Sequence, residues 1–216
     1  MKNNPFSQPI SEQIWNMKYR LITPNPEIQN DESVYDTWHR IAHACAQADI
    51  QTYGYGRDLP KEEWERIATN REQIFYEALE NFRFLPAGRI TAGAGSARSV
   101  TLFNCFVMGT IPDSLIGIFD MLKEAALTMQ QGGGIGYDFS TIRPKGSRVK
   151  GVDADASGPI SFMNVWDAMC RTIMSAGSRR GAMMATMSCS HPDVVEFITA
   201  KQDPALLRMF NVFVLC

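Results

Sequence analysis

The 216-residue sequence has few cysteines, little net charge and no long apolar run. Its five cysteines form an odd, scattered set with no CxxC pair, which argues against a disulfide scaffold and a zinc site and favours a cytoplasmic protein. No apolar run approaches the ~18 residues that a membrane span needs, and no apolar stretch of a secretory signal follows Met1. The formal net charge of −2 gives no electrostatic reason to expect binding to nucleic acid or to an anionic membrane.

Apolar residues at helical spacing predict that the first part of the chain is helical. We expect helices over Ile10–Leu21, Ser33–Ile50 and Lys61–Phe82. The second helix is expected to bury Val34, Trp38, Ile41, Ala42 and Cys45. The third helix is expected to bury Trp64, Ile67, Ile74, Ala78 and Phe82. His39 and His43 have the spacing of a metal-binding pair, but no acidic or cysteine partner lies at a suitable spacing, so we expect no metal there.

From Phe84 onward, strand-forming runs alternate with helical ones. A loop rich in Gly, Ala and Ser is expected up to Ser99. We then expect strands over 101–108, 135–139, 183–188 and 210–216, and helices over 114–131, 160–176 and 192–201. Asp113 is expected to cap the amino terminus of the first of these helices. The sequence therefore predicts an α/β fold class, with a helical domain at 1–83 followed by an α/β domain at 84–216.

The glycine run at 132–136 has the composition of a nucleotide-binding loop but not its context. It ends a predicted helix and enters a predicted strand, which is the reverse of the order in a dinucleotide-binding fingerprint. No Gly-Lys-Ser/Thr follows, so it is not a Walker A loop either. We interpret it as a tight turn with close backbone packing.

Two loops at the ends of the predicted helix 160–176 carry basic residues. One holds Arg143, Lys145, Arg148 and Lys150, and the other holds Arg179 and Arg180 beside Gly181. Cationic side chains on loops at helix ends suit a polyanion such as a triphosphate. The alternative is a pair of solvated basic loops, and composition alone leaves both interpretations open.

Cys105 lies in the middle of an apolar strand run. A buried, unreactive cysteine is the usual occupant of such a position, and Cys45, Cys170 and Cys189 fit the same description. The neighbouring Asn104 is polar, however, which indicates a strand that faces a polar cavity. The residues by themselves leave both possibilities open.

Several short motifs follow one another in a fixed order. They are Phe84-Leu85-Pro86-Ala87-Gly88-Arg89, Leu102-Phe103-Asn104-Cys105-Phe106-Val107, Asp113-Ser114-Leu115, Gly133-Gly134-Ile135-Gly136-Tyr137-Asp138-Phe139-Ser140, Ile142-Arg143-Pro144-Lys145-Gly146-Ser147, Ser178-Arg179-Arg180-Gly181-Ala182 and His191-Pro192-Asp193. The ordered set, over about residues 80–215, resembles the catalytic subunit of ribonucleotide reductase. The motifs around Tyr137 and Pro144 resemble the adenosylcobalamin-dependent (class II) branch more than the iron-dependent one.

This resemblance implies the amino-terminal part of an oxidoreductase that makes deoxyribonucleotides from ribonucleotides by radical chemistry, oxidising a cysteine pair. The implied fold is a helical domain followed by the first part of a ten-stranded α/β barrel. It also implies a homodimer, a deoxynucleoside triphosphate effector, thioredoxin or glutaredoxin as reductant, and adenosylcobalamin as cofactor of the full-length enzyme. The name that fits is ribonucleoside-diphosphate reductase, although the residues leave the number of substrate phosphates open.

The resemblance also assigns roles to individual residues. Cys105 would be one of the two thiols that reduce the ribose. Asn104 and the backbone of Ala87 and Gly88 would line the substrate pocket. An allosteric deoxynucleotide would meet the following residues: Asp113 at its ribose, Arg143 and Lys150 at its phosphates, and Arg179 and Arg180 on the loop that links effector to substrate choice. The helices 114–131 and 160–176 would pack against their copies in the dimer.

The chain departs from the family's pattern in three ways. Ala87 and Gly88 stand where the family often has Ser or Thr, so only their backbone is expected to line the pocket. The amino terminus lacks the basic nucleotide-binding cone of some members, so no overall on/off site is expected. The radical-carrying cysteine, within Asn-x-Cys-x-Glu, and the cobalamin-contacting parts have no counterpart up to Cys216, so the chain is expected to be inactive alone.

Two further possibilities stay open at this point. A stand-alone dimerising module that binds deoxynucleotides without catalysis would share the effector residues. The end of the sequence at Cys216, inside a predicted strand, fits either a truncated sequence or an intein boundary, because inteins commonly begin with cysteine.

Overall fold

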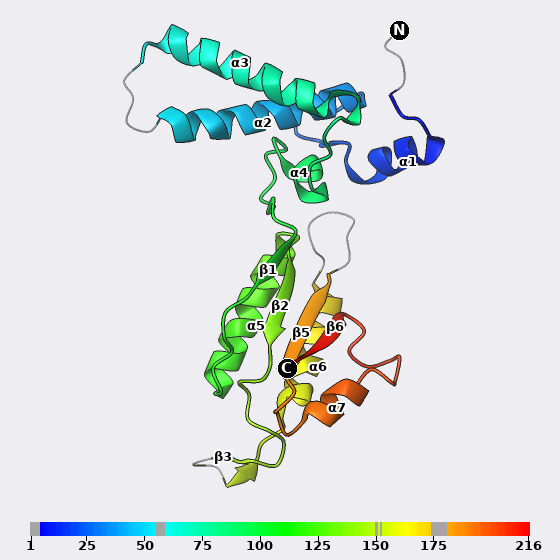
Figure 1. Ribbon diagram of the computed structural model, residues 1–216, viewed down its shortest axis with the longest axis vertical. Helices are drawn as coiled ribbons and strands as arrows, with labels where there is room; N and C mark the ends of the chain where they lie inside the picture. The colour runs from blue at the N-terminus through cyan, green and yellow to red at the C-terminus, as the bar shows by residue number, and fades with distance from the viewer. Residues whose placement is uncertain (1–4, 55–58, 150, 152, 174–180) are drawn as a thin grey trace. The chain divides into compact units, whose positions relative to one another are not determined.

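The computed structural model describes residues 5–54, 59–149, 151, 153–173 and 181–216 (Figure 1). These residues belong to two compact units, Met1–Leu102 and Phe103–Cys216. The first is a helical unit, and the second, here called the sheet unit, is built on parallel strands. No helix among the described residues is long and apolar enough to cross a membrane.

The helical unit is formed around two long helices that lie side by side (Figure 1). Its elements are α1 (Pro9–Lys18), α2 (Val34–Gly54), α3 (Lys61–Leu79), the short 3-10 helix η1 (Glu80–Phe82) and α4 (Gly88–Gly93). Its buried core consists of Trp15, Val34, Trp38, Ile41, Ala42, Leu79 and Ala94. The buried face expected on the second helix is thus confirmed, except that Cys45 is only half-buried.

The face expected on the third helix is partly wrong. Ile74 is 48% exposed and Ala78 is exposed, whereas Leu79 is buried and Phe75 packs against the core. Each residue turns a helix by about 100°, so the buried face is displaced by one position from the expected one. The helix also ends earlier than expected, at Leu79, and Asn81 then takes a left-handed conformation with φ of 57°.

A buried ion pair joins α2 to the segments around it. The Arg40 Nη2 atom lies 3.0 Å from the Asp31 Oδ2 atom, and both side chains are almost fully buried. Arg40 also donates hydrogen bonds to the backbone carbonyls of Ala94 at 2.5 Å and Thr91 at 3.2 Å. These contacts attach α4 and the chain beyond it to the helical unit. The unit therefore reaches Leu102, further than the expected range 1–83.

The sheet unit contains repeated strand–helix–strand connections. Its elements are β1 (Cys105–Val107), α5 (Leu115–Gln130), β2 (Gly134–Asp138), β3 (Arg148–Val149), β4 (Ala154–Asp155), α6 (Pro159–Thr172), β5 (Met183–Ser188), α7 (Val194–Thr199) and β6 (Phe210–Leu215). The main sheet has the order β1-β2-β5-β6, and every neighbouring pair is parallel. The small hairpin β3-β4 lies within the segment that was expected to be a basic loop before the helix 160–176. The α/β class is confirmed.

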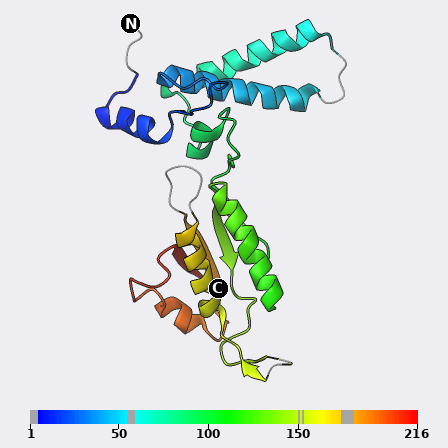
Figure 2. The same cartoon turned by 180° about the vertical axis from the view of Figure 1, so that it is seen from behind.

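One face of the main sheet is covered and the other is open. Figure 2 shows α5 and α6 on the near side of the strands. Beneath them the core includes Ile135, Tyr137, Met163, Trp166, Met183, Ala185, Met187 and Phe210. Alternate strand residues point away from these helices, so Val107 is 99% exposed and Phe213 and Leu215 are about half exposed. Such an uncovered apolar face fits the start of a larger barrel.

The glycine run forms the expected tight turn between α5 and β2. Gly132 has a φ of 90°, which favours glycine. A Cβ atom on Gly133 would come within 2.8 Å of the Phe106 ring, too close for any larger residue. The close approach lets β2 pair with β1 directly after the helix ends.

Candidate functional site

Two of the residues expected to bind an effector, Asp113 and Arg143, line a cavity of about 210 Å³ in the sheet unit. Its walls come from the amino terminus of α5, the loop after β2, the β3-β4 hairpin and the start of α6. The lining residues are Asp113, Ser114, Leu115, Ile118, Ile142, Arg143, Val149, Asp155, Ala156, Ser157, Gly158 and Phe162. The fold therefore brings Asp113 and Arg143 together. The other cavity residues were given no effector role, because they contribute backbone, apolar contacts or polar side chains of common types.

Asp113 and Arg143 bind each other across this cavity. Arg143 Nε donates to Asp113 Oδ2 at 2.8 Å, and the Arg143 backbone N–H donates to Oδ1 at 3.2 Å. Arg143 Nη2 also donates to the Asp113 carbonyl at 3.1 Å. Both side chains are about one-third exposed, so the pair stabilises the fold only modestly. The guanidinium has five N–H donors, and those left over can still meet an anion.

Ser114, not Asp113, caps the amino terminus of α5, which corrects the expected cap. The Ser114 Oγ atom accepts a hydrogen bond from the Gly117 N–H at 3.1 Å. The Asp113 carboxylate instead forms an ion pair with Arg143. The first amides of α5 point toward the cavity end of the helix, where the helix dipole favours negative charge.

Three of the expected effector-binding residues, Lys150, Arg179 and Arg180, lie outside the described residues. Among the described lining residues, the charged ones are Arg143, Asp113 and Asp155. Carboxylates thus outnumber cations in this part of the cavity. A triphosphate there would need further positive charge, which Lys150 and the arginine loop could supply.

Asn104 and Cys105 lie at the start of β1, and both are exposed. The Asn104 carbonyl accepts the Gly134 N–H at 2.8 Å, and Cys105 pairs in register with Gly134. A Cβ atom on Gly134 would lie 3.1 Å from the Cys105 Sγ atom. Glycine at this position therefore leaves room for the thiol on the open face of the sheet. Of the two possibilities for Cys105, the structure shows the exposed one.

The other cysteines differ in their surroundings. Cys170 is 3% exposed, and burial, together with the negative charge of Asp167, raises its thiol pKa to about 11. Burial also raises the pKa of half-buried Cys45. Cys189 is exposed, so the expectation that it is buried is wrong: it lies just beyond the carboxyl end of β5, outside the core of the sheet unit. Its thiol contacts that of Cys216, which raises the pKa of Cys216.

Ala87 and Gly88, the remaining expected substrate residues, belong to the helical unit. Ala87 precedes the first residue of α4, which is Gly88. Gly88 lies at an apolar cavity of about 490 Å³ whose lining includes the rings of Trp15, Tyr19, Trp38 and Phe84. Ala87 and Gly88 are both exposed.

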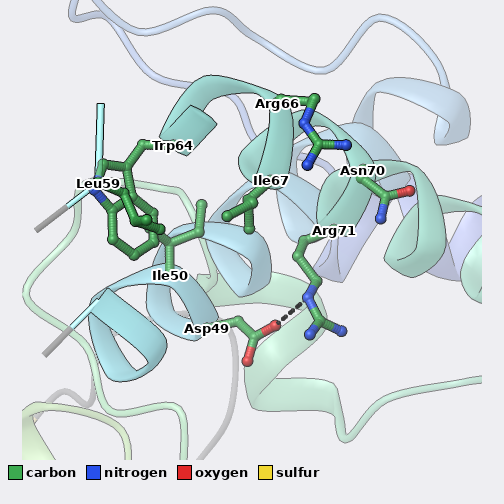
Figure 3. A pocket seen from close by; sticks show the side chains of 8 residues that line it. All are labelled: Asp49, Ile50, Leu59, Trp64, Arg66, Ile67, Asn70 and Arg71. Carbon is green, nitrogen blue, oxygen red and sulfur yellow. Dashed lines mark ion pairs between the residues drawn. The ribbon is translucent and has the colours of Figure 1, made fainter. Parts of the chain in front are cut away.

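A further cavity of about 350 Å³ lies between α2 and α3 (Figure 3). Ile50, Leu59 and Trp64 form its apolar side, and a 3.1 Å ion pair joins Asp49 to Arg71 across it. Trp64 and Ile67, which were expected on the buried face of the third helix, line it, and the sequence assigned none of its lining residues a binding or catalytic role. His39 and His43 are engaged elsewhere: the His39 ring stacks on Tyr76, and the His43 Nδ1 atom lies 2.8 Å from a Glu72 oxygen.

The comparisons with known proteins decide the family. The description "Ribonucleotide reductase, all-alpha domain" matches residues 6–99, and "Ribonucleotide reductase, barrel domain" matches residues 103–213, just over half of the chain. The chain belongs to the ribonucleotide reductase family. The two matched domains coincide closely with the helical unit and the sheet unit.

Individual relatives agree with this assignment. The chain is 38% identical, over 92% of its length, to a vitamin B12-dependent ribonucleoside-diphosphate reductase of Mycobacterium tuberculosis, of which it covers 27%. It is 38% identical, over 65% of its length, to an identically named protein of Thermoplasma acidophilum, of which it covers 18%. It is 36% identical, over 63% of its length, to a ribonucleoside-diphosphate reductase subunit alpha of Helicobacter pylori, covering 18%. The chain thus spans about a quarter or less of these relatives.

Proposed function

We propose that the chain supplies the helical domain and the first barrel strands of a cytoplasmic reductase that converts ribonucleotides to deoxyribonucleotides. The observation that carries the proposal is Cys105: an exposed thiol on the open face of a parallel sheet, over a glycine, within a matched barrel domain. A reducing thiol must reach the substrate, and a buried one could not. The alternative of a stand-alone binding module is not supported, because the relatives are named as reductases.

In the proposed reaction, Cys105 works with a second cysteine of the enzyme. The ribose loses its 2′-hydroxyl as water and gains a hydrogen at that carbon. The two thiols lose two hydrogens and form a disulfide, which balances atoms and electrons. A dithiol reductant of the thioredoxin or glutaredoxin type then restores both thiols. Asn104 and the backbone at Ala87 and Gly88 are proposed to line the pocket that holds the substrate.

Adenosylcobalamin is the proposed radical source, because two of the relatives described above are named as vitamin B12-dependent. The residues of this chain do not fit a ligand to its cobalt. None of the three histidines lines a cavity described above: His39 and His43 contact α3, and both ring nitrogens of buried His191 are hydrogen-bonded. We therefore propose that the cofactor is held by other parts of the reductase.

The cavity at Asp113 and Arg143 is the proposed site of a deoxynucleoside triphosphate effector. Arg143 and Lys150 would face its phosphates, and Asp113 its ribose. Arg179 and Arg180 would lie on the loop that links the effector to substrate choice. The exposed apolar residues Leu115, Ile116, Phe119 and Leu127 on α5 are proposed to be covered by α5 and α6 of a second copy, because a monomer leaves them in water.

Two measurements test the proposed function. The 216-residue chain alone, supplied with adenosylcobalamin and a dithiol, should form no deoxynucleotide. A chimera in which it replaces the matching segment of the M. tuberculosis relative should form deoxynucleotide, and the Cys105→Ser chimera should not turn over. A Cys189→Ser chimera is the matched control, since Cys189 is exposed but has no proposed role. An active Cys105→Ser chimera would overturn the assignment.

A further inference from the structure

The turn between β5 and α7 is hydrogen-bonded to the loop that carries Arg143. His191 in this turn is only 8% exposed. Its Nδ1 atom accepts the Asp193 backbone N–H at 3.1 Å, so the ring proton is on Nε2. Nε2 lies 2.9 Å from the Ile142 carbonyl oxygen and donates to it. The imidazole therefore links its own turn to a residue 49 positions away.

Asp193 makes a second link from the same turn. Its Oδ2 atom accepts the Lys145 backbone N–H at 2.8 Å. A Cβ atom on Gly158 would lie 3.0 Å from this oxygen, so Asp193 also packs against the residue that precedes α6. A third link lies nearby, where the Ser140 Oγ atom accepts the Ser188 N–H at 2.7 Å.

These links flank the effector cavity. Ile142 and Lys145 are the backbone anchors, and Arg143 lies between them in the sequence. Ile142, Arg143 and Gly158 themselves line the cavity. Movement of either anchor would therefore displace the guanidinium that faces Asp113.

We propose that His191 and Asp193 are positioning residues that hold the backbone on both sides of Arg143 and thereby set the affinity of the cavity for a deoxynucleoside triphosphate. The proposal rests on the proposed effector site. The proposal also couples the cavity to the carboxyl end of β5, because the turn that holds the loop begins where that strand ends. His191 and Asp193 contact the loop backbone and are not among the residues that line the cavity.

Substitutions of similar shape test the His191–Ile142 and Asp193–Lys145 hydrogen bonds one at a time. His191→Asn keeps an acceptor where Nδ1 lies but cannot reach Ile142, whereas His191→Gln places a donor where Nε2 lies. Asp193→Ala removes the link to Lys145, and Asp193→Asn keeps an oxygen for it. Glu196→Gln is the matched control, because Glu196 pairs with the same Lys145, but through exposed side-chain atoms 3.6 Å apart.

Two readouts are needed on the 216-residue chain: calorimetric dissociation constants for dATP, dGTP and dTTP, and backbone hydrogen exchange of residues 139–149. His191→Asn and Asp193→Ala should each weaken binding and speed exchange in this segment by about twofold to tenfold, the effect of one hydrogen bond. His191→Gln, Asp193→Asn and Glu196→Gln should stay near the wild type.

The outcomes are distinguishable. If His191→Asn and His191→Gln behave alike, or if exchange rises equally across the whole sheet unit, His191 is merely structural and the proposal is wrong. If the wild-type chain binds none of the three nucleotides, the effector site fails, and loop exchange alone decides whether the two residues hold the loop. Unchanged exchange in His191→Asn and Asp193→Ala would overturn the proposal in either case.

Discussion

Arg143 and Asp113 lie 30 positions apart in the sequence, yet three hydrogen bonds join them in the lining of one cavity. The contact fixes the loop after β2 against the amino terminus of α5. It also neutralises two charges that the sequence resemblance assigned to different parts of a nucleotide. A bound nucleotide would therefore meet a preassembled pair and not two independent side chains.

Arg143→Ala should weaken deoxynucleoside triphosphate binding by about tenfold to 150-fold. It removes a charge-assisted contact of about 1.5–3 kcal/mol and leaves the Asp113 carboxylate facing the phosphates. At 100 times the dissociation constant, ligand should stabilise the wild type by about 2.7 kcal/mol. Calorimetry and thermal melting measure both effects. Arg148→Ala is the control, because Arg148 pairs with Asp153 on the exposed hairpin and does not line the cavity.

Ser114→Ala should lower the free energy of unfolding of the sheet unit by about 1 kcal/mol, because it removes the side-chain acceptor at the start of α5. Ser114→Asp should restore most of the loss. Urea titration followed by circular dichroism measures the effect. Unchanged stability in Ser114→Ala would contradict the assignment of the cap to Ser114.

The difference between Ser114 and Asp113 shows how far the sequence could lead. Both residue types cap helices well, so the pattern could not choose between them. Asp113 does not cap the helix because Arg143, on a loop distant in the sequence, hydrogen-bonds to the Asp113 carboxylate. In contrast, the core face of α2 and the alternating burial of β5 were predictable, because each follows a local periodicity that packing did not override.

The links from His191 and Asp193 could not be predicted for the same reason. The His-Pro-Asp motif was visible in the sequence, but its partners are the backbone groups of Ile142 and Lys145, and backbone groups carry no sequence signal. The exposure of Cys105 was left open by its apolar neighbours. It depends on Gly134 in the adjacent strand and on a face of the sheet that the described helices α5 and α6 leave uncovered; only the sheet register reveals this pairing.

Arg40→Met should destabilise the helical unit by about 3–5 kcal/mol, because it leaves the Asp31 carboxylate buried without its cation. The carboxylate would keep only the Leu21 N–H and the Thr37 hydroxyl as donors. Combining Arg40→Met with Asp31→Asn should recover part of the loss. Thermal unfolding of the two variants tests this, and Arg66→Met, which breaks an exposed pair with Glu63, should change stability little. Equal effects of Arg40→Met and Arg66→Met would contradict it.

Cys105 should react with iodoacetamide faster than Cys45 and Cys170 in the native chain. Only the thiolate reacts, and burial raises the pKa of both comparison thiols, that of Cys170 to about 11. Below that pKa, labelling of Cys170 should rise about tenfold for each pH unit. Mass-mapped labelling over a pH series measures all the cysteines at once.

The same shift predicts how stability depends on pH. The pKa of Cys170 is raised in the folded state from its ordinary value of 9.0, so folding favours the protonated thiol. Its contribution to stability is fully present below pH 9 and is lost as the pH rises toward 11. Cys170→Ala removes this group, so its unfolding free energy should fall less steeply than that of the wild type over this range. If the unfolding free energies of the wild type and Cys170→Ala fall equally steeply, the Cys170 pKa is not raised by folding. Slow labelling of Cys170, if observed, would then reflect restricted access alone.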